Sequence, residues 1–466
     1  MELIKLSVEK LFNTFSYSIN INAKEKITLL HGQNGLGKTV VLKLIQLFFD
    51  QNFLELKSIQ FTNFCLHFDP NLEIKITRVT KNDEIQLKIE KYKNGKRTED
   101  PPFTTKDNTS YKRYYSSTKY LNQSSFLFDL DELYDDRIDY KTLEYIITSN
   151  LPEIRMIGPG MWFDVRTKRE YTLPQLIARY GKLFPKKIQD IFEFPKWLSE
   201  ILQSQKVRFI ETQRLLNRIK TEDSKYKSAV VEFSQAIIDT IKTVRAEASD
   251  RASRLDRTYP KRLLEKLGNT ENITERQIES NLSVLEEKRK LLNDVGLIDA
   301  EEEYIQPYIG FQQNEIIKSV LELYINDSNE KLSVYDNLGK RIKLFLDIIN
   351  RRFLYKTFSI DKQRGFIFTS DITKNDIPIN GLSSGEQHEL VLFYILLFRT
   401  PHDSILLIDE PEISLHISWQ KHFIEDLKEV IKINEMKIII ATHSPDIIGN
   451  NWDLTVQLTG IEKTEE

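Results

Sequence analysis

The chain of 466 residues has one cysteine, Cys65, which excludes an intramolecular disulfide and a zinc site built from several cysteines. It also lacks a long apolar run, since the longest, Leu390 to Phe398, falls far short of the roughly 20 residues of a membrane span. The net charge of −3 argues against a protein that coats nucleic acid by bulk charge. No secretory signal is present, so we expect a cytoplasmic protein with two or three lobes.

One motif stands out near the N-terminus. An apolar, strand-like run ends at His31, and a helix-like run begins at Val40. The eight residues between them fit the phosphate-binding pattern G-x-x-x-x-G-K-[ST] and are Gly32, Gln33, Asn34, Gly35, Leu36, Gly37, Lys38 and Thr39. Such a loop wraps a phosphate chain with backbone N–H groups. We therefore predict that Lys38 reaches the β- and γ-phosphates of the bound phosphate chain and that the Thr39 hydroxyl ligates Mg²⁺.

The hydrophobic pattern predicts an α/β protein, with strands over most of residues 1–31 and an antiparallel sheet over 54–95 that includes a hairpin turn at Asn94-Gly95. Residues 131–204 are expected to be mostly helical, and 206–210 to form a buried strand. We place the first lobe at 1–213, a helical arm at 214–355 and the last lobe at 356–466.

The expected arm is rich in charge and poor in glycine, with apolar residues at spacings of three and four that are typical of amphipathic helices and coiled coils. We expect a break at Tyr259-Pro260. Thr274 and Gln277 form a capping box that begins the next helix. Strands are expected again from Leu354 to Ile360 and from Gly365 to Thr369.

Three further segments carry phosphate or metal chemistry. Ser383, Ser384, Gly385 and Glu386 open an apolar helix, where a hydroxyl and free N–H groups suit a γ-phosphate; an ordinary helix cap is the alternative. The apolar strand 404–408 ends in Asp409 and Glu410. Asp409 is suited to holding Mg²⁺, and Glu410 to polarising an attacking water.

The third segment is a buried strand, 437–441, that delivers His443 to the same sheet edge, where it can sense the γ-phosphate and hold the water. Gln213, after the strand 206–210, is a candidate to complete the Mg²⁺ shell, with Gln123 as its rival. A solvated glutamine at a strand end is the competing interpretation for Gln213.

Together and in this order, the motifs resemble those of ABC-type ATPases, in the form found in the SMC and OLD branch. The segments Leu406–His416 and Thr442–Pro445 are similar to the OLD-like group. The segment Phe209–Leu215 resembles those of stand-alone anti-phage defence ATPases, such as the ATPases of the PARIS, Septu and retron-associated systems.

The resemblance implies a P-loop ABC-type head with an antiparallel subdomain and an inserted α-helical or coiled-coil arm. It implies ATP and Mg²⁺ as cofactors and ATP sandwiched between two copies of the chain. One copy would supply Lys38 and Thr39, and the other Ser384 and Gly385. Glu410 would be the catalytic carboxylate and His443 the switch. Ser414 to His416 would form the D-loop at the interface, and Phe12 or Phe15 would cover the adenine.

OLD nucleases carry a TOPRIM domain after the head, and this chain shows no acidic cluster with enough sequence around it for one. We therefore expect a sensor or scaffold ATPase of an anti-phage system that works as a homodimer or larger oligomer with a separate effector, such as a TOPRIM or HNH nuclease.

The alternative is an SMC-like, DNA-binding ATPase of recombination or repair. Its motivation is a basic cluster in the arm that consists of Arg251, Arg254, Arg257, Lys261 and Arg262. A transporter subunit is disfavoured by the arm and by the lack of a membrane segment.

Overall fold

The computed structural model describes residues 1–81, 84–105, 147–149, 151–158, 161–165, 169–172, 176, 179–180, 183, 194–211, 219–220, 226–227, 229–268, 274–299, 315–413 and 415–460. The chain forms two compact units. Unit 1 takes residues 1–211, 401–411 and 435–466, and unit 2 takes 212–400 and 412–434. The segment 356–466 therefore contributes to both units, while the three-part division of the chain stays a prediction.

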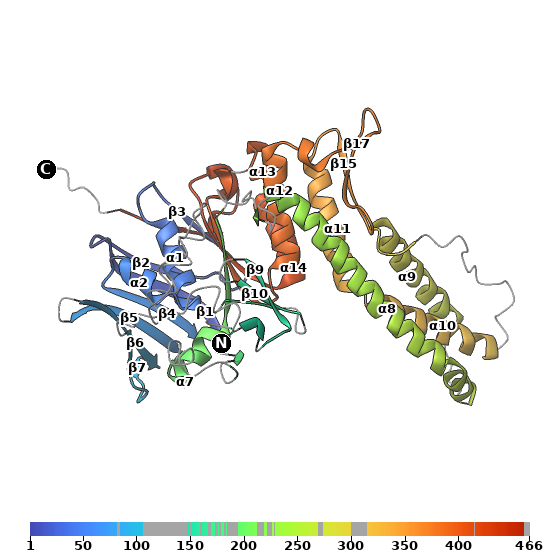
Figure 1. The fold of residues 1–466 in the computed structure, drawn as a ribbon, viewed down its shortest axis with the longest axis horizontal. Helices are drawn as coiled ribbons and strands as arrows, with labels where there is room; N and C mark the ends of the chain where they lie inside the picture. The colour runs from blue at the N-terminus through green and yellow to red at the C-terminus, as the bar shows by residue number, and fades with distance from the viewer. Residues whose placement is uncertain are drawn as a thin grey trace. The chain divides into compact units, whose positions relative to one another are not determined.

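The first sheet of unit 1 is antiparallel, with the order β2-β1-β4-β5-β6-β7 and β8 beside β6 (Figure 1). Its strands are β1 (Glu2–Leu11), β2 (Phe15–Asn20), β4 (Asn63–Asp69), β5 (Leu72–Lys81), β6 (Glu84–Lys93), β7 (Lys96–Arg97) and β8 (Phe103–Thr104). Asn94 and Gly95 connect β6 to β7 with positive φ values of 52° and 74°, as a tight hairpin turn requires. The strands expected over 1–31 are confirmed, and those expected over 54–95 are confirmed from Asn63 onward, because Phe53–Ser58 forms a helix.

The second sheet of unit 1 is parallel, with the order β12-β18-β19-β3-β20. Its strands are β3 (Ile27–His31), β12 (Lys206–Glu211), β18 (Ser404–Asp409), β19 (Lys437–Ala441) and β20 (Thr455–Gln457). Helix α1 (Lys38–Phe49) packs between the two sheets in one apolar core, together with α2 (Phe53–Ser58) and α7 (Lys196–Ser204). Two short helical turns, α15 (Pro445–Ile448) and Trp452–Leu454, precede β20. Since the carboxyl ends of parallel strands share one edge, this sheet gathers the motifs that follow β3, β18 and β19.

Two expectations for unit 1 are wrong. The described residues between 151 and 172 form a three-stranded antiparallel sheet, with β9 (Ile154–Gly158), β10 (Met161–Asp164) and β11 (Arg169–Thr172), where helices were expected. Short strands around the buried Trp162 give too little periodicity to distinguish them from helix. The strand β12 was expected to be buried, but only Ile210 is, because β12 is the edge strand of its sheet.

Unit 2 contains the helical arm. Helices α8 (Ala229–Gly268), α9 (Glu275–Asp294) and α10 (Glu315–Ser333) lie side by side as an elongated bundle (Figure 1). The capping box of Thr274 and Gln277 is confirmed at the start of α9. A short hairpin, β13 (Ile219–Lys220) and β14 (Tyr226–Lys227), precedes α8. In the part of the chain that the structure describes, no helix combines the length and the apolar character of a membrane span.

The break expected at Tyr259-Pro260 is wrong, because α8 continues through Pro260. A proline inside a helix removes one backbone hydrogen bond and normally kinks or ends the helix. Here α8 is held against α10 on both sides of the proline. The Lys331 ammonium lies 2.7 Å from the Asp256 carboxylate, and the Arg262 guanidinium forms a bidentate ion pair with Asp327. Tertiary contacts therefore override the local signal.

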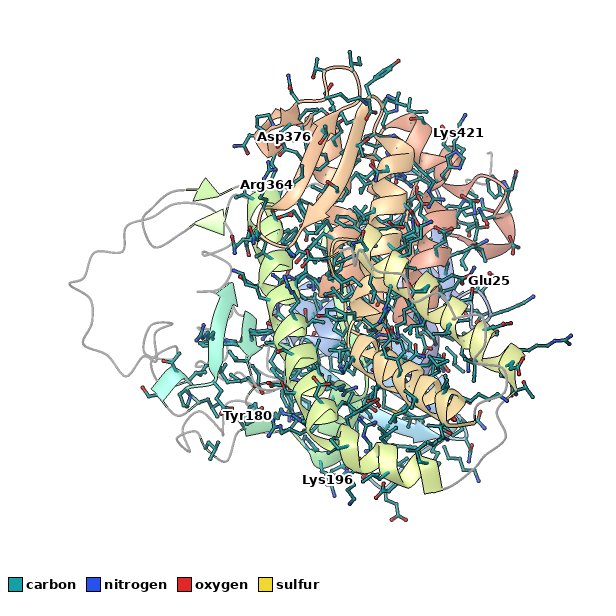
Figure 2. All side chains as sticks on the ribbon, turned by 90° about the vertical axis from the view of Figure 1, so that its right-hand side faces the viewer. Glu25, Tyr180, Lys196, Arg364, Asp376 and Lys421 are labelled. Carbon is teal, nitrogen blue, oxygen red and sulfur yellow. The ribbon has the colours of Figure 1, made fainter. Side chains whose placement is uncertain are left out.

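The rest of unit 2 surrounds the base of the arm. Helix α11 (Asp336–Arg352) leads into the sheet of β15 (Lys356–Asp361), β16 (Gly365–Ser370) and β17 (Asp376–Ile377). Arg364 and Asp376 form an ion pair at this sheet (Figure 2). The turn Ile379–Gly381 precedes α12 (Ser384–Tyr394), which continues as a wider helical turn, Ile395–Arg399. The turn Pro411–Ile413, α13 (Ile417–Gln420) and α14 (Phe423–Asn434) complete the fold.

Candidate nucleotide-binding and catalytic site

The loop between β3 and α1 has the backbone of a phosphate cradle. Gly37, which precedes α1, has φ +82°, and a Cβ placed there would lie 3.0 Å from the Leu11 side chain and 3.2 Å from the Phe12 ring. A Cβ at Gly32 would lie 2.7 Å from the carbonyl oxygen of Leu458. Glycine is required at both positions, because a larger residue would collide with the walls of the loop.

The start of α1 has no side-chain cap. The first N–H groups of a helix have no partner within the helix, so an uncapped N-terminus offers them to an anion. Lys38 is the first residue of this helix. Its buried ammonium donates to the carbonyl oxygens of Gly32 and Gln33, at 2.9 and 3.2 Å. The loop thus presents backbone donors and one fixed positive charge, and these features fit a polyphosphate.

Thr39 and Asp409 are brought together at the carboxyl end of β18. The Thr39 hydroxyl donates to Oδ1 of Asp409 at 2.8 Å. Burial raises the pKa of Asp409, as do the charges of Glu410 and Glu211, while the hydrogen bond from Thr39 and the charge of Lys43 lower it. A hydroxyl and a carboxylate are hard oxygen donors of the kind that Mg²⁺ prefers, so this pair fits a magnesium ion. When bound, the ion would neutralise phosphate charge.

Glu410 has an unusual backbone conformation. Its φ is +45°, and its N–H donates to the carbonyl oxygen of Ala441 on the neighbouring strand at 2.8 Å. Left-handed backbone at a residue with a side chain costs energy and is concentrated at functional sites. Asp409 contacts Thr39, whereas Glu410 contacts His443, so the two adjacent carboxylates have different partners. Two adjacent acids can therefore serve a metal and a water.

His443 lies beside Glu410. Its Nδ1 is 3.6 Å from Oε1 of Glu410, and the two side chains are 45% and 26% exposed. The contact arises because β18 and β19 are neighbours and both segments leave the sheet at the same edge. The structure thus places the two predicted catalytic residues together, next to the loop that carries Lys38 and Thr39.

The second phosphate-binding candidate, at the start of α12, belongs to unit 2. Ser383 caps α12 by accepting the N–H of Glu386 at 3.3 Å, while the Glu386 carboxylate accepts the Ser383 N–H at 2.8 Å. The same carboxylate pairs with the Lys356 ammonium at 2.6 Å. Ser384 is exposed and Gly385 half-exposed. Ser383 and Glu386 are therefore engaged in capping, which was the alternative for this segment, whereas Ser384 faces solvent.

Some predicted residues lie outside the described part of the chain, namely Gln213, its rival Gln123, and Ser414 of the expected D-loop. Both aromatic candidates for the adenine lie on the β1–β2 hairpin. The Phe12 ring, 40% exposed, approaches Gly37, whereas Phe15 stacks on Tyr17 with 6.0 Å between ring centres. Tyr17 in turn donates its hydroxyl to the Leu36 carbonyl at 2.8 Å.

Several residues of the basic cluster form ion pairs or hydrogen bonds within the arm itself. Arg262 is bound to Asp327, and Arg251 donates to the Ser333 hydroxyl at 3.2 Å. Lys261 lies 3.7 Å from the Glu265 carboxylate. These contacts favour the interpretation of this cluster as part of the arm's own surface and weaken its use as a phosphate grip.

The sequence analysis did not identify two residues at the edge of the parallel sheet that carries Asp409. Lys43 lies on α1 one turn after Thr39, and Glu211 is the last residue of β12, directly opposite Asp409 in the sheet. The sequence nevertheless contained a signal for each of these two residues. Residues four apart share a helix face, and a carboxylate at the end of a parallel strand lies at the edge where ligands bind.

The geometry is that of a P-loop ATPase fold, with a parallel sheet that carries the loop and the acids at one edge and with a helical arm in unit 2. The chain belongs to the AAA_15 family, described as an AAA ATPase domain, which matches residues 1–448. It accordingly contains an AAA ATPase domain.

Curated relatives match parts of the chain. The "Retron Ec83 probable ATPase" of Escherichia coli is 25% identical over 227 residues, which are 47% of this chain and 34% of the relative. A "Probable iron chelatin transport ATP-binding protein" of Helicobacter pylori (strain ATCC 700392 / 26695) is 32% identical over 83 residues, which are 18% of this chain and 31% of the relative. The chain thus spans about a third of the length of the curated relatives it matches.

Two solved structures are similar to the chain at a low level. The SMC head domain of Thermotoga maritima has 10% identity and a TM-score of 0.31, with 98% of this chain and 95% of that chain covered. The Smc head domain of Pyrococcus furiosus with an extended coiled coil, bound to the C-terminal domain of ScpA, has 11% identity and a TM-score of 0.32, with 96% and 91% covered. Similarity at this level does not transfer an activity or a partner.

Proposed function

We propose that the chain is the ATP-hydrolysing sensor or scaffold of a bacterial anti-phage system and that it acts with a separate effector, such as a TOPRIM or HNH nuclease. The observation that carries the ATPase part is the shared sheet edge, where Lys38, Thr39, Asp409, Glu410 and His443 meet. The defence part is supported by the motif resemblance and by the partial match to the ATPase of a retron.

In the proposed reaction each side chain has one task. Lys38 and the N–H groups of α1 bind the phosphates, while Thr39 and Asp409 hold Mg²⁺. Glu410 accepts a proton from the attacking water, and His443 orients that water through its contact with Glu410. Ser384 of a second copy would complete the pocket, so that ATP joins two copies into a dimer at the least.

The test uses Glu410→Gln, which removes the proton acceptor but keeps a polar group of similar size. We expect ATP hydrolysis to fall by about 10²–10⁴-fold while ATP remains bound and dimers accumulate in light scattering. Lys38→Ala serves as the control that neither retains ATP nor dimerises. An unchanged hydrolysis rate in Glu410→Gln would show that another residue is the base.

The effector is tested separately. The chain with Glu410→Gln should co-purify from its native host with the product of a neighbouring gene, and more so with ATP than without. Loss of phage resistance on deletion of either gene would support the pairing. A chain that protects cells without any second gene would contradict it.

A further inference from the structure

Helix α1 contacts two strand ends with two side chains one turn apart. The Thr39 hydroxyl reaches Asp409 on β18 at 2.8 Å, and the Lys43 ammonium lies 4.0 Å from Oε1 of Glu211 on β12. Positions four apart lie on the same face of a helix, so both contacts point from α1 to the same edge of the sheet. Lys43 is therefore part of the surroundings of the predicted magnesium ligands.

Glu211 and Asp409 are neighbours by register. Strands β12 and β18 are parallel, and Glu211 is paired directly with Asp409. Neighbouring strands are about 4.8 Å apart, and paired side chains leave the same face of the sheet. Both carboxylates contact α1, which confirms that they share a face.

We propose that Glu211 is an outer-sphere group of the magnesium site, where it accepts a hydrogen bond from a metal-bound water, and that Lys43 limits its negative charge. The proposal rests on the proposed function of this edge as the Mg²⁺–ATP site. Magnesium keeps several of its waters in proteins, so carboxylates beyond its direct ligands orient those waters. Glu211 and Lys43 are thus positioning residues, and neither needs to touch the nucleotide.

The two side chains should have opposite effects on binding. Glu211→Gln removes a negative charge near the metal, so Mg²⁺ should bind more weakly, while ATP without metal should meet less repulsion and bind more tightly. Lys43→Met removes a positive charge beside Glu211, so Mg²⁺ should bind more tightly and ATP without metal more weakly. A loosened fold would instead weaken ATP binding both with Mg²⁺ and without it. Opposite changes in affinity under the two conditions therefore distinguish the proposed role from a loss of structure.

The experiment measures binding of a fluorescent ATP analogue, first with MgCl₂ titrated in and then in EDTA. For Glu211→Gln we expect the Mg²⁺ concentration at half-maximal binding to rise about tenfold, and affinity in EDTA to increase two- to threefold. For Lys43→Met both shifts should have the opposite sign. The double variant should return toward the wild-type values, because both charges are removed together.

Matched controls are Lys24→Met and Glu99→Gln, which change the same charges on exposed parts of unit 1 and should shift neither value. Weaker binding in both conditions, or no shift in either, would overturn the role of Glu211 and Lys43. Failure of the proposed function is distinct, since wild type and Lys38→Ala would then bind the Mg²⁺–ATP analogue equally well.

Discussion

The helices that carry the two phosphate-binding motifs begin in opposite ways. In unit 1, α1 starts after a glycine and has no side-chain cap. In unit 2, α12 starts with a complete capping box, and Lys356 holds its Glu386 in addition. An uncapped N-terminus gives its donors to a ligand, whereas a capped one keeps its own structure and presents a neighbouring hydroxyl. The difference supports our proposal that α1 binds a phosphate chain, while α12 holds Ser384 in place at its capped start.

The largest expected effect separates the two helices by function. Lys38→Ala should weaken ATP binding about 100-fold, because a charged contact to phosphate is lost, whereas Ser384→Ala should leave binding by the isolated chain intact and stop hydrolysis. Mixing the two inactive variants should restore about a quarter of the wild-type rate, since half of the dimers are mixed and each has one intact site. A mixture without activity would contradict a pocket shared between copies.

The two glycines at these helix starts should differ in their contribution to folding. Gly37→Ala forces a side chain into left-handed backbone against Leu11 and Phe12 and should lower the free energy of unfolding by about 2 kcal/mol. Gly385→Ala places a methyl group 3.9 Å from Trp419, an ordinary contact, and should be neutral or slightly stabilising. Urea unfolding of both variants measures the difference. Equal losses would show that the loop before α1 has no special backbone requirement.

Removing the cap should affect α12 moderately. Ser383→Ala deletes the acceptor for the Glu386 N–H and should destabilise unit 2 by about 1 kcal/mol. Ser383→Asp keeps an acceptor at the cap and should restore most of that stability in thermal unfolding. If alanine and aspartate behave alike, the hydrogen bond is not what holds the start of the helix.

A pH-dependent effect concerns the other end of α1. Burial raises the pKa of Asp50, which follows the last turn, to about 7, and a hydrogen bond to Gln46 only partly opposes this. The folded state thus holds this proton more tightly than the unfolded chain, so the contribution of Asp50 is full at acidic pH and is lost as pH rises through about 7. Asp50→Asn should flatten the fall in the free energy of unfolding between about pH 4 and pH 7, measured by urea unfolding. If the free energy of unfolding depends on pH equally in the wild type and the variant, Asp50 is not the source of that dependence.

The local sequence predicted the strands and the helix that carry the candidate nucleotide-binding residues. An apolar strand, a glycine-rich loop and Lys38-Thr39 define their own geometry, and the acids after strand 404–408 lie where parallel strands must end. The strands at 151–172 and the exposed edge position of β12 were not predictable in this way, because short strands carry little periodicity and burial depends on which strands become neighbours.

By itself the sequence determined the chemistry of the edge, since Gly32, Lys38, Thr39, Asp409 and Glu410 each stand in a motif with one local solution. Only the tertiary structure decided which distant groups join them. The order of the parallel strands pairs Glu211 with Asp409 and brings His443 to Glu410, and packing on α10 carries α8 through Pro260. Contacts between residues hundreds of positions apart depend on strand order and packing, and no local pattern encodes either one.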